Sequence, residues 1–159
     1  MSITTDLVAT WTRPRAILRQ HLARGQSEPF ALSFLLVFLL LAFVGQWPVA
    51  AREAFLAGEP SATPRIIAVA YGVLLLIPLA YLVSALSRLV ARAMGGQGTW
   101  YSARIALFWA LAAIGPLFLL QGMVAGMVGP GPALTLVRVA VGIAFLWLWI
   151  TLLHEAERG

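Results

Sequence analysis

Residues 34–41 read FLLVFLLL, a run of apolar side chains with no polar residue between them. The run lies inside a longer apolar stretch, 30–47, and similar stretches follow at about 66–86, 105–128 and 133–153. A helix needs about 20 apolar residues to cross the hydrocarbon core of a bilayer. None of these stretches contains Asp or Glu. The sequence therefore predicts a membrane protein with four spans.

The composition supports the same prediction. The chain has 159 residues, a length typical of one domain, and it is 61% apolar and only 11% charged. A water-soluble domain carries roughly 25% charged residues. Transmembrane β-strands alternate apolar and polar residues, which these runs do not. We predict an all-α fold, a transmembrane four-helix bundle with an N-terminal interfacial amphipathic helix.

The cationic side chains, all of them Arg, indicate the orientation. A net charge of +5 suggests nucleic acid in a soluble domain, but in a membrane protein arginines set topology and contact anionic headgroups. No nucleic-acid partner is expected. The arginines gather before the first span, between the second and third, and in the tail. Since short cytoplasmic segments retain positive charge, both termini are predicted to be cytoplasmic, with an arm at 1–29, a membrane domain at 30–153 and a tail at 154–159.

The arm is predicted to be one basic amphipathic helix in the headgroup plane. Thr12 is the expected N-cap, Pro14 lies in the first turn and Gly25 ends the helix. The alternative is a disordered basic leader that only enforces topology. The arginines expected to contact lipid headgroups, here and beyond the second span, are Arg15, Arg19, Arg24, Arg88, Arg92 and Arg104.

Three connections carry further local signals. Residues 49–56 are expected to form a short separate helix on the membrane that ends at Gly58. The sequence Gly95-Gly96-Gln97-Gly98 is expected to end the second long helix, because it neither follows a strand nor carries the Lys of a phosphate-binding loop. Thr99 is the expected cap of the helix that follows.

Small residues recur at a spacing typical of helix packing in lipid. Two interpretations stay open: internal packing of one bundle, or an interface with a second copy or another membrane protein. The residues assigned to this interface are Gly122, Gly126, Ala106, Ala110, Ala140 and Ala144.

Two prolines interrupt spans at their middles. Pro78 and Pro116 each remove a backbone hydrogen bond, and Gln121 is the most polar side chain well inside a span. The two segments resemble a miniature inverted repeat, the arrangement in which transporters place substrate sites. The alternatives are an intramembrane polar site for a small transporter or channel, and plain packing geometry.

The remaining polar residues do not indicate an enzyme. No Asp, Glu or His lies within a span, there is no cysteine, and His21 and His154 lie in opposite terminal segments. Glu155 and Glu157 are interpreted as a solvated tail. We therefore expect no catalytic residue, metal or cofactor. Arg104 and Arg138 lie near span ends, where they either snorkel to headgroups or clamp an acidic lipid or a partner's carboxylate.

Several stretches together resemble the Ypt-interacting-protein (Yip) domain family, in a bacterial form. They are Arg13-Pro14-Arg15, Leu22-Ala23-Arg24-Gly25 with Ser27-Glu28, Gln46-Trp47-Pro48, Ala51-Arg52-Glu53-Ala54, Gly95-Gly96-Gln97-Gly98-Thr99-Trp100, Ala103-Arg104-Ile105-Ala106-Leu107-Phe108-Trp109 and Gly126-Met127-Val128-Gly129-Pro130-Gly131.

This resemblance covers essentially the whole chain and implies a non-enzymatic integral protein of the bacterial inner membrane. Eukaryotic relatives are linked to Rab-type GTPases and vesicle traffic, and they usually have five spans. With four spans and a short arm, this chain does not carry over the GTPase role. The hypothesis is a membrane-organising, interaction or accessory-subunit protein that acts through helix faces and anionic lipids; the alternative is the small transporter or channel.

Overall fold

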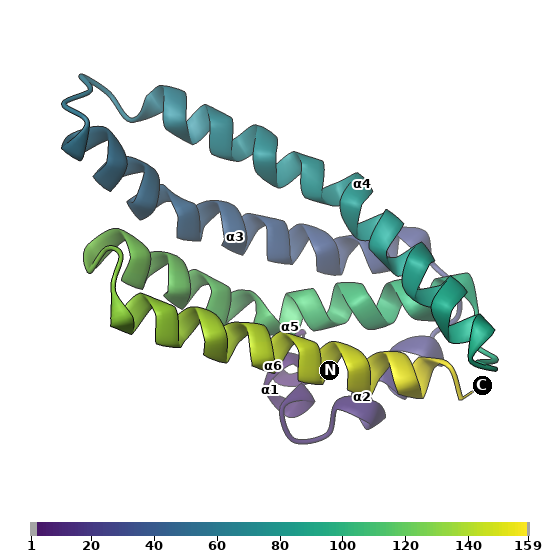
Figure 1. Ribbon diagram of the computed structural model, residues 1–159. Coiled ribbons are helices and arrows are strands. Elements are labelled where there is room, and N and C mark those ends of the chain that lie inside the picture. Colours follow the sequence, from purple (N-terminus) through teal and green to yellow (C-terminus); the bar gives the residue numbers. More distant parts are fainter. Residues whose placement is uncertain (1–2, 159) are drawn as a thin grey trace.

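The computed structural model describes residues 3–158, and within this range it contains six helices and no strand. Two short helices form the arm, α1 (Ile3–Thr10) and α2 (Pro14–Leu22). Four long helices follow, α3 (Glu28–Leu56), α4 (Thr63–Ala93), α5 (Trp100–Met127) and α6 (Pro132–Ala156) (Figure 1). The predicted all-α fold is confirmed.

The four long helices are long and apolar enough to cross a membrane. They have 25 to 31 residues, or about 38–46 Å at 1.5 Å per residue. The hydrocarbon core is about 30 Å thick, so each helix projects a few ångströms beyond it. This supports a multi-pass membrane protein.

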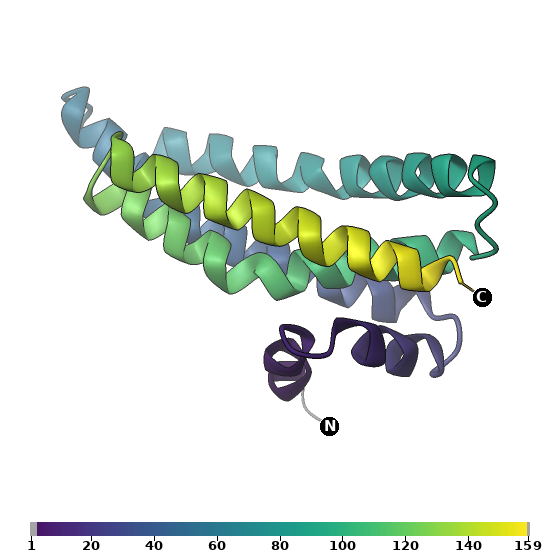
Figure 2. The same ribbon diagram turned by 60° about the horizontal axis from the view of Figure 1, so that its bottom comes forward.

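Helix α5 is the central element of the bundle. It buries more residues than any other helix, and its largest interface is with α3. Helix α4 packs on both members of this pair and α6 packs on α5, whereas the backbones of α4 and α6 do not approach each other. Figure 1 shows α3 and α5 between them, and Figure 2 shows the arm against one side of the bundle.

The α3–α5 interface depends on a close approach of two glycines. A Cβ atom added to Gly122 would lie 2.1 Å from the carbonyl oxygen of Gly45, and one added to Gly126 would lie 2.3 Å from Pro48. Small residues let helix backbones approach in lipid, where packing rather than hydrophobicity drives association. Residues Gly122 and Gly126 thus pack inside this bundle, against α3.

Two local predictions differ from the structure. The arm forms two helices because Pro14 begins α2 at its first position, with Arg13 as N-cap and no side-chain cap bond. The Thr12 hydroxyl instead donates to the Ala9 carbonyl. Residues 49–56 are not a separate helix, because α3 runs through Pro48 and ends at Leu56. At Pro48 the neighbouring Gly126 of α5 leaves room for the proline ring.

The predicted helix ends are confirmed where local chemistry sets them. Gly25, Gly58 and Gly95 have positive φ angles just past helix ends, a conformation that glycine adopts without steric cost. Thr99 caps α5 in a capping box with Ser102, in which each side chain bonds the other residue's backbone N–H.

Candidate functional site

Most of the polar contacts between distant parts of the chain lie at one end of the bundle, which we call the arm end. The N-termini of α3 and α5, the C-termini of α4 and α6 and the arm meet there (Figure 2). The opposite end, the loop end, carries the connections 57–62 and 128–131.

The arm packs onto α5 and α6 through its apolar side and one buried hydrogen bond. Ile17 and Leu18 of α2 are buried. The indole Nε1 of Trp109 donates to the hydroxyl of Thr10 at 3.0 Å, and that hydroxyl donates to the backbone carbonyl of Asp6 at 2.7 Å. This chain of bonds fixes the end of α1 to α5, so the arm is a folded part of the domain.

His21 is buried within this contact. Its ring lies 4.3 Å from the Trp109 ring and 5.1 Å from the Phe34 ring, centroid to centroid. Burial, and then the charge of Arg24, lower the pKa of His21 from 6.5 to about 4, while Asp6 raises it less. Among the described residues neither ring nitrogen has a hydrogen-bond partner. At neutral pH the imidazole is therefore uncharged and acts as a packing group.

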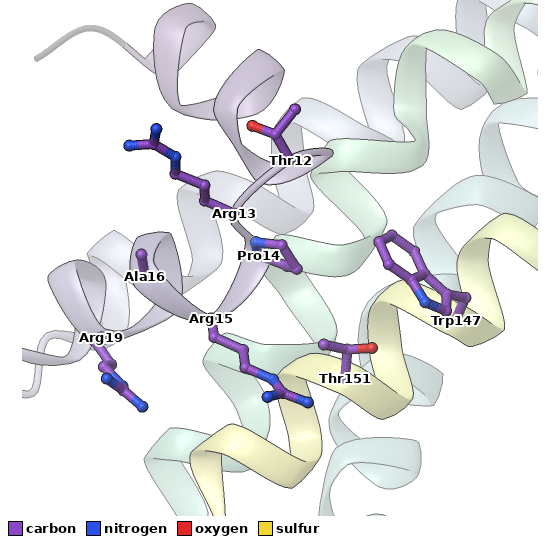
Figure 3. Close-up of a pocket in the computed structure, with 8 residues that line it drawn as sticks. All are labelled: Thr12, Arg13, Pro14, Arg15, Ala16, Arg19, Trp147 and Thr151. Atoms are coloured by element: carbon purple, nitrogen blue, oxygen red, sulfur yellow. The ribbon is translucent and has the colours of Figure 1, made fainter.

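A shallow pocket of about 520 Å³ lies between the arm and α6. We call it the arginine pocket; it is lined by Thr12, Arg13, Pro14, Arg15, Ala16, Arg19, Trp147 and Thr151. Figure 3 shows Arg15 extending toward α6 beside Thr151, with Trp147 at the edge of the pocket. Among the described residues, Arg13 and Arg15 form no ion pair. A cationic pocket next to an exposed indole suits an anion held at a membrane surface.

Arg19 joins this pocket to the end of α6. Its guanidinium donates to the carboxylate of Glu155, whose side chain is buried while that of Arg19 is largely exposed. Arg19 also lines the pocket, so the ion pair ties the pocket to the last turn of α6.

The interpretation of Glu155 and Glu157 as a solvated tail is wrong. Helix α6 continues to Ala156, and both carboxylates pack against the bundle. The carboxylate of Glu157 accepts hydrogen bonds from Arg88 at 2.9 Å and from the backbone N–H of Gly98 at 3.1 Å. The side chains of Arg88 and Glu157 are both nearly buried. A Cβ on Gly98 would lie 2.5 Å from the Ala156 carbonyl oxygen. The glycine-rich connection thus ends α4 and also encloses the carboxylate of the last turn.

The six arginines predicted to contact headgroups divide into two groups. Arg19, Arg88 and Arg104 bond carboxylates of this chain, and Arg104 also lies over the Tyr81 ring. Arg15, Arg24 and Arg92 are exposed without an ion pair among the described residues, although Arg24 lies over the Phe30 ring. The second group is free to bind lipid.

The predicted intramembrane polar site is only partly assembled. Pro78 and Pro116 are exposed, α4 and α5 stay continuous through them, and neither lines the apolar groove between α4 and α6. Gln121 lines the adjoining pocket between α5 and α6, together with Arg138.

The four alanines that were predicted to form a helix interface differ in burial between α5 and α6. Ala106 and Ala110 are fully buried in α5, whereas on α6 Ala144 is half-buried and Ala140 is exposed. Helix α6 packs instead through larger side chains, at Leu134, Val141, Leu148 and Leu152.

The described residues contain no group of three His, Cys, Asp or Glu side chains that could hold a metal ion. Comparison of the chain with protein-family models, curated proteins and solved structures gave no match. The site therefore has to be interpreted from its own geometry. The sequence analysis missed Thr10 and Trp109 as arm contacts, because residues 99 positions apart leave no local pattern.

Proposed function

We propose that this protein is a non-enzymatic protein of the bacterial inner membrane that binds anionic phospholipid at its arm and organises or assists another membrane protein. The arginine pocket carries the proposal. Arg13 and Arg15 have no carboxylate partner in the described chain, both line the pocket, and Arg15 extends toward α6 (Figure 3).

The anion that suits this pocket is a phospholipid headgroup of the cytoplasmic leaflet. Trp147 is about half exposed at the pocket edge, on the side of the pocket that faces the lipid tails. An acyl chain attached to a phosphate in the pocket would run along α6 beside this indole. Each arginine near an anionic surface contributes about 1 kcal/mol.

A partner would meet the protein on α4. This helix buries only Ala80 and Ser84, and its outer side exposes large apolar residues, among them Tyr71, Leu75 and Leu82. Such a face is satisfied equally by lipid tails or by the helix of a second membrane protein. The accessory-subunit role, the resemblance to the Yip family and the cytoplasmic orientation of both termini belong to this proposal.

The transporter or channel alternative has less support. It requires a polar cavity at the proline kinks, but the groove between α4 and α6 is lined near its middle by aliphatic and aromatic side chains.

Lipid binding by the full-length protein in mild detergent tests the proposal. Native mass measurement would compare phosphatidylglycerol, which is anionic, with zwitterionic phosphatidylcholine. Changing both Arg13 and Arg15 to Gln should weaken phosphatidylglycerol binding at this site about 30-fold, since two arginines contribute about 2 kcal/mol. Arg158→Gln is the matched control, because it removes a charge at the same end outside the pocket. Equal losses in both variants would mean that net charge alone binds lipid, and the proposal would fail.

A further inference from the structure

A second lipid site lies at the other end of the molecule and does not depend on the arginine pocket. We infer that the apolar groove along α6 binds one acyl chain of an anionic phospholipid from the leaflet at the loop end, and that Arg138 and Gln121 at its loop end bind the phosphate. The inference rests on the shape of the groove, its position relative to the membrane and the absence of a counter-ion for Arg138.

The groove exists because α4 packs on α3 and α5 while α6 packs on α5, and the backbones of α4 and α6 do not approach each other (Figure 1). Two adjoining pockets of about 360 and 220 Å³ share the side chains of Phe38, Leu111, Phe118 and Phe145, so they form one continuous groove. The larger part lies between α4 and α6, and the part at the loop end is lined by α3, α5 and α6 only. The groove faces the space between two membrane-spanning helices, where lipid tails lie.

The length of the groove matches an acyl chain. Along α5 it extends from Leu107 to Gln121, or about 21 Å at 1.5 Å per residue. One leaflet contributes about 15 Å to a hydrocarbon core about 30 Å thick. A tail that enters at the loop end is therefore accommodated along its full depth.

The groove changes from apolar to polar at the loop end, at the level of a headgroup. Gln121 lies six residues before the end of α5 at Met127, and Arg138 lies six residues after the start of α6 at Pro132. Both are therefore about 9 Å from the helix ends, close to the hydrocarbon boundary of helices that project a few ångströms. An arginine at this depth extends its guanidinium to the headgroups.

The counter-ion of Arg138 has to come from outside the chain. Among the described residues, neither Arg138 nor Gln121 has a side-chain hydrogen bond or an ion pair. The two carboxylates near the loop end, Glu53 and Glu59, both bond Arg65. An unpaired cation and an amide at the mouth of a groove lined by apolar side chains fit the phosphate and tail of a phospholipid better than a free anion.

Native mass measurement of the full-length protein tests this site. The starting protein carries Arg13→Gln and Arg15→Gln, so that the arginine pocket does not contribute. Phosphatidylglycerol should still bind, and Arg138→Gln should weaken this binding about five-fold, the effect expected for one arginine, while Arg138→Lys should retain it. The reciprocal protein, with Arg13 and Arg15 intact and Arg138→Gln, should keep its binding at the arm end, so failure of one site is distinguishable from failure of the other.

The groove itself is tested with a phosphatidylglycerol that carries a photoreactive group in its acyl chain. Cross-links are expected at Leu111, Phe118 and Phe145, and Leu111→Trp should remove them by filling the groove. Glycerol phosphate, which has no tail, should not compete. Unchanged lipid binding in Arg138→Gln, competition by glycerol phosphate, or cross-links confined to the outer face of α4 would each overturn the inference, as would a copurified protein whose carboxylate pairs with Arg138.

Discussion

Adding one methyl group at Gly122 should separate the two central helices. The Cβ of Gly122→Ala would lie 2.1 Å from the Gly45 carbonyl oxygen and 2.5 Å from its carbon, whereas ordinary contacts begin at 3.4 Å. Both obstructing atoms belong to the backbone, which cannot rotate away as a side chain does. Helices α3 and α5 must therefore move apart by roughly 1 Å or more. A gap of this size loses a quarter to a half of the dispersion energy of each affected contact.

The expected cost follows from two opposing effects. Overpacking of this kind costs typically 1–3 kcal/mol and sometimes more, and this is the largest interface in the bundle. The better helix propensity of alanine returns up to about 1 kcal/mol. We expect Gly122→Ala to lower the free energy of unfolding by about 2 kcal/mol.

Unfolding in mixtures of SDS and mild detergent, followed by tryptophan fluorescence, measures this change. Gly142→Ala in α6 is the control, because no atom lies within 4 Å of the added Cβ; it should be neutral or slightly stabilising. If Gly122→Ala unfolds at the same SDS fraction as the unchanged protein, α3 and α5 do not pack as described.

Three further predictions concern the arm end. His21 should have its ordinary pKa of 6.5 in the released arm and a pKa of about 4 in the docked arm. Docking is therefore strongest above pH 6.5 and weakens as the pH falls toward 4, by about 2 kcal/mol at pH 5. A fluorescent label on α1 reports release of the arm, and His21→Phe should abolish the pH dependence. Glu157→Gln leaves two nearly buried partners without their carboxylate and should cost about 3 kcal/mol in SDS unfolding, whereas Glu59→Gln at an exposed ion pair should change nothing measurable. Thr10→Val keeps the volume of the side chain but removes the hydroxyl that accepts from Trp109, so the arm should be cleaved faster by trypsin, with a docking loss of about 1 kcal/mol; unchanged cleavage would contradict the bond.

The sequence predicts the long helices because their causes are local. Four apolar runs without acids are long enough to cross a membrane as helices, and glycines such as Gly58 and Gly95 end helices where the chain needs a positive φ angle. Thr99 likewise caps α5 through a residue three positions away. The helices nevertheless extend beyond the apolar runs. Helix α3, for example, continues through Pro48, which packs against Gly126 of α5.

The site was less predictable because its contacts join distant residues. Arg19 and Glu155 lie 136 positions apart, and no periodic pattern relates an arm to a tail. Glu157 therefore looked solvated in the sequence, although the fold gives it a cation and a backbone N–H. One signal was available: Gly45 is the single glycine in the first apolar run, which marks it as the place where the Gly122 backbone can approach.

The central claim, that four helices cross a membrane with the arm and the last turn of α6 on one side, has a direct test. The chain has no cysteine, so Gln26→Cys, Ser61→Cys and Arg158→Cys each introduce a single thiol. A membrane-impermeant maleimide should label Ser61→Cys in intact spheroplasts, and the other two variants only in inverted vesicles. Labelling of Ser61→Cys and Arg158→Cys from the same side, or release of the protein from membranes without detergent, would contradict the topology.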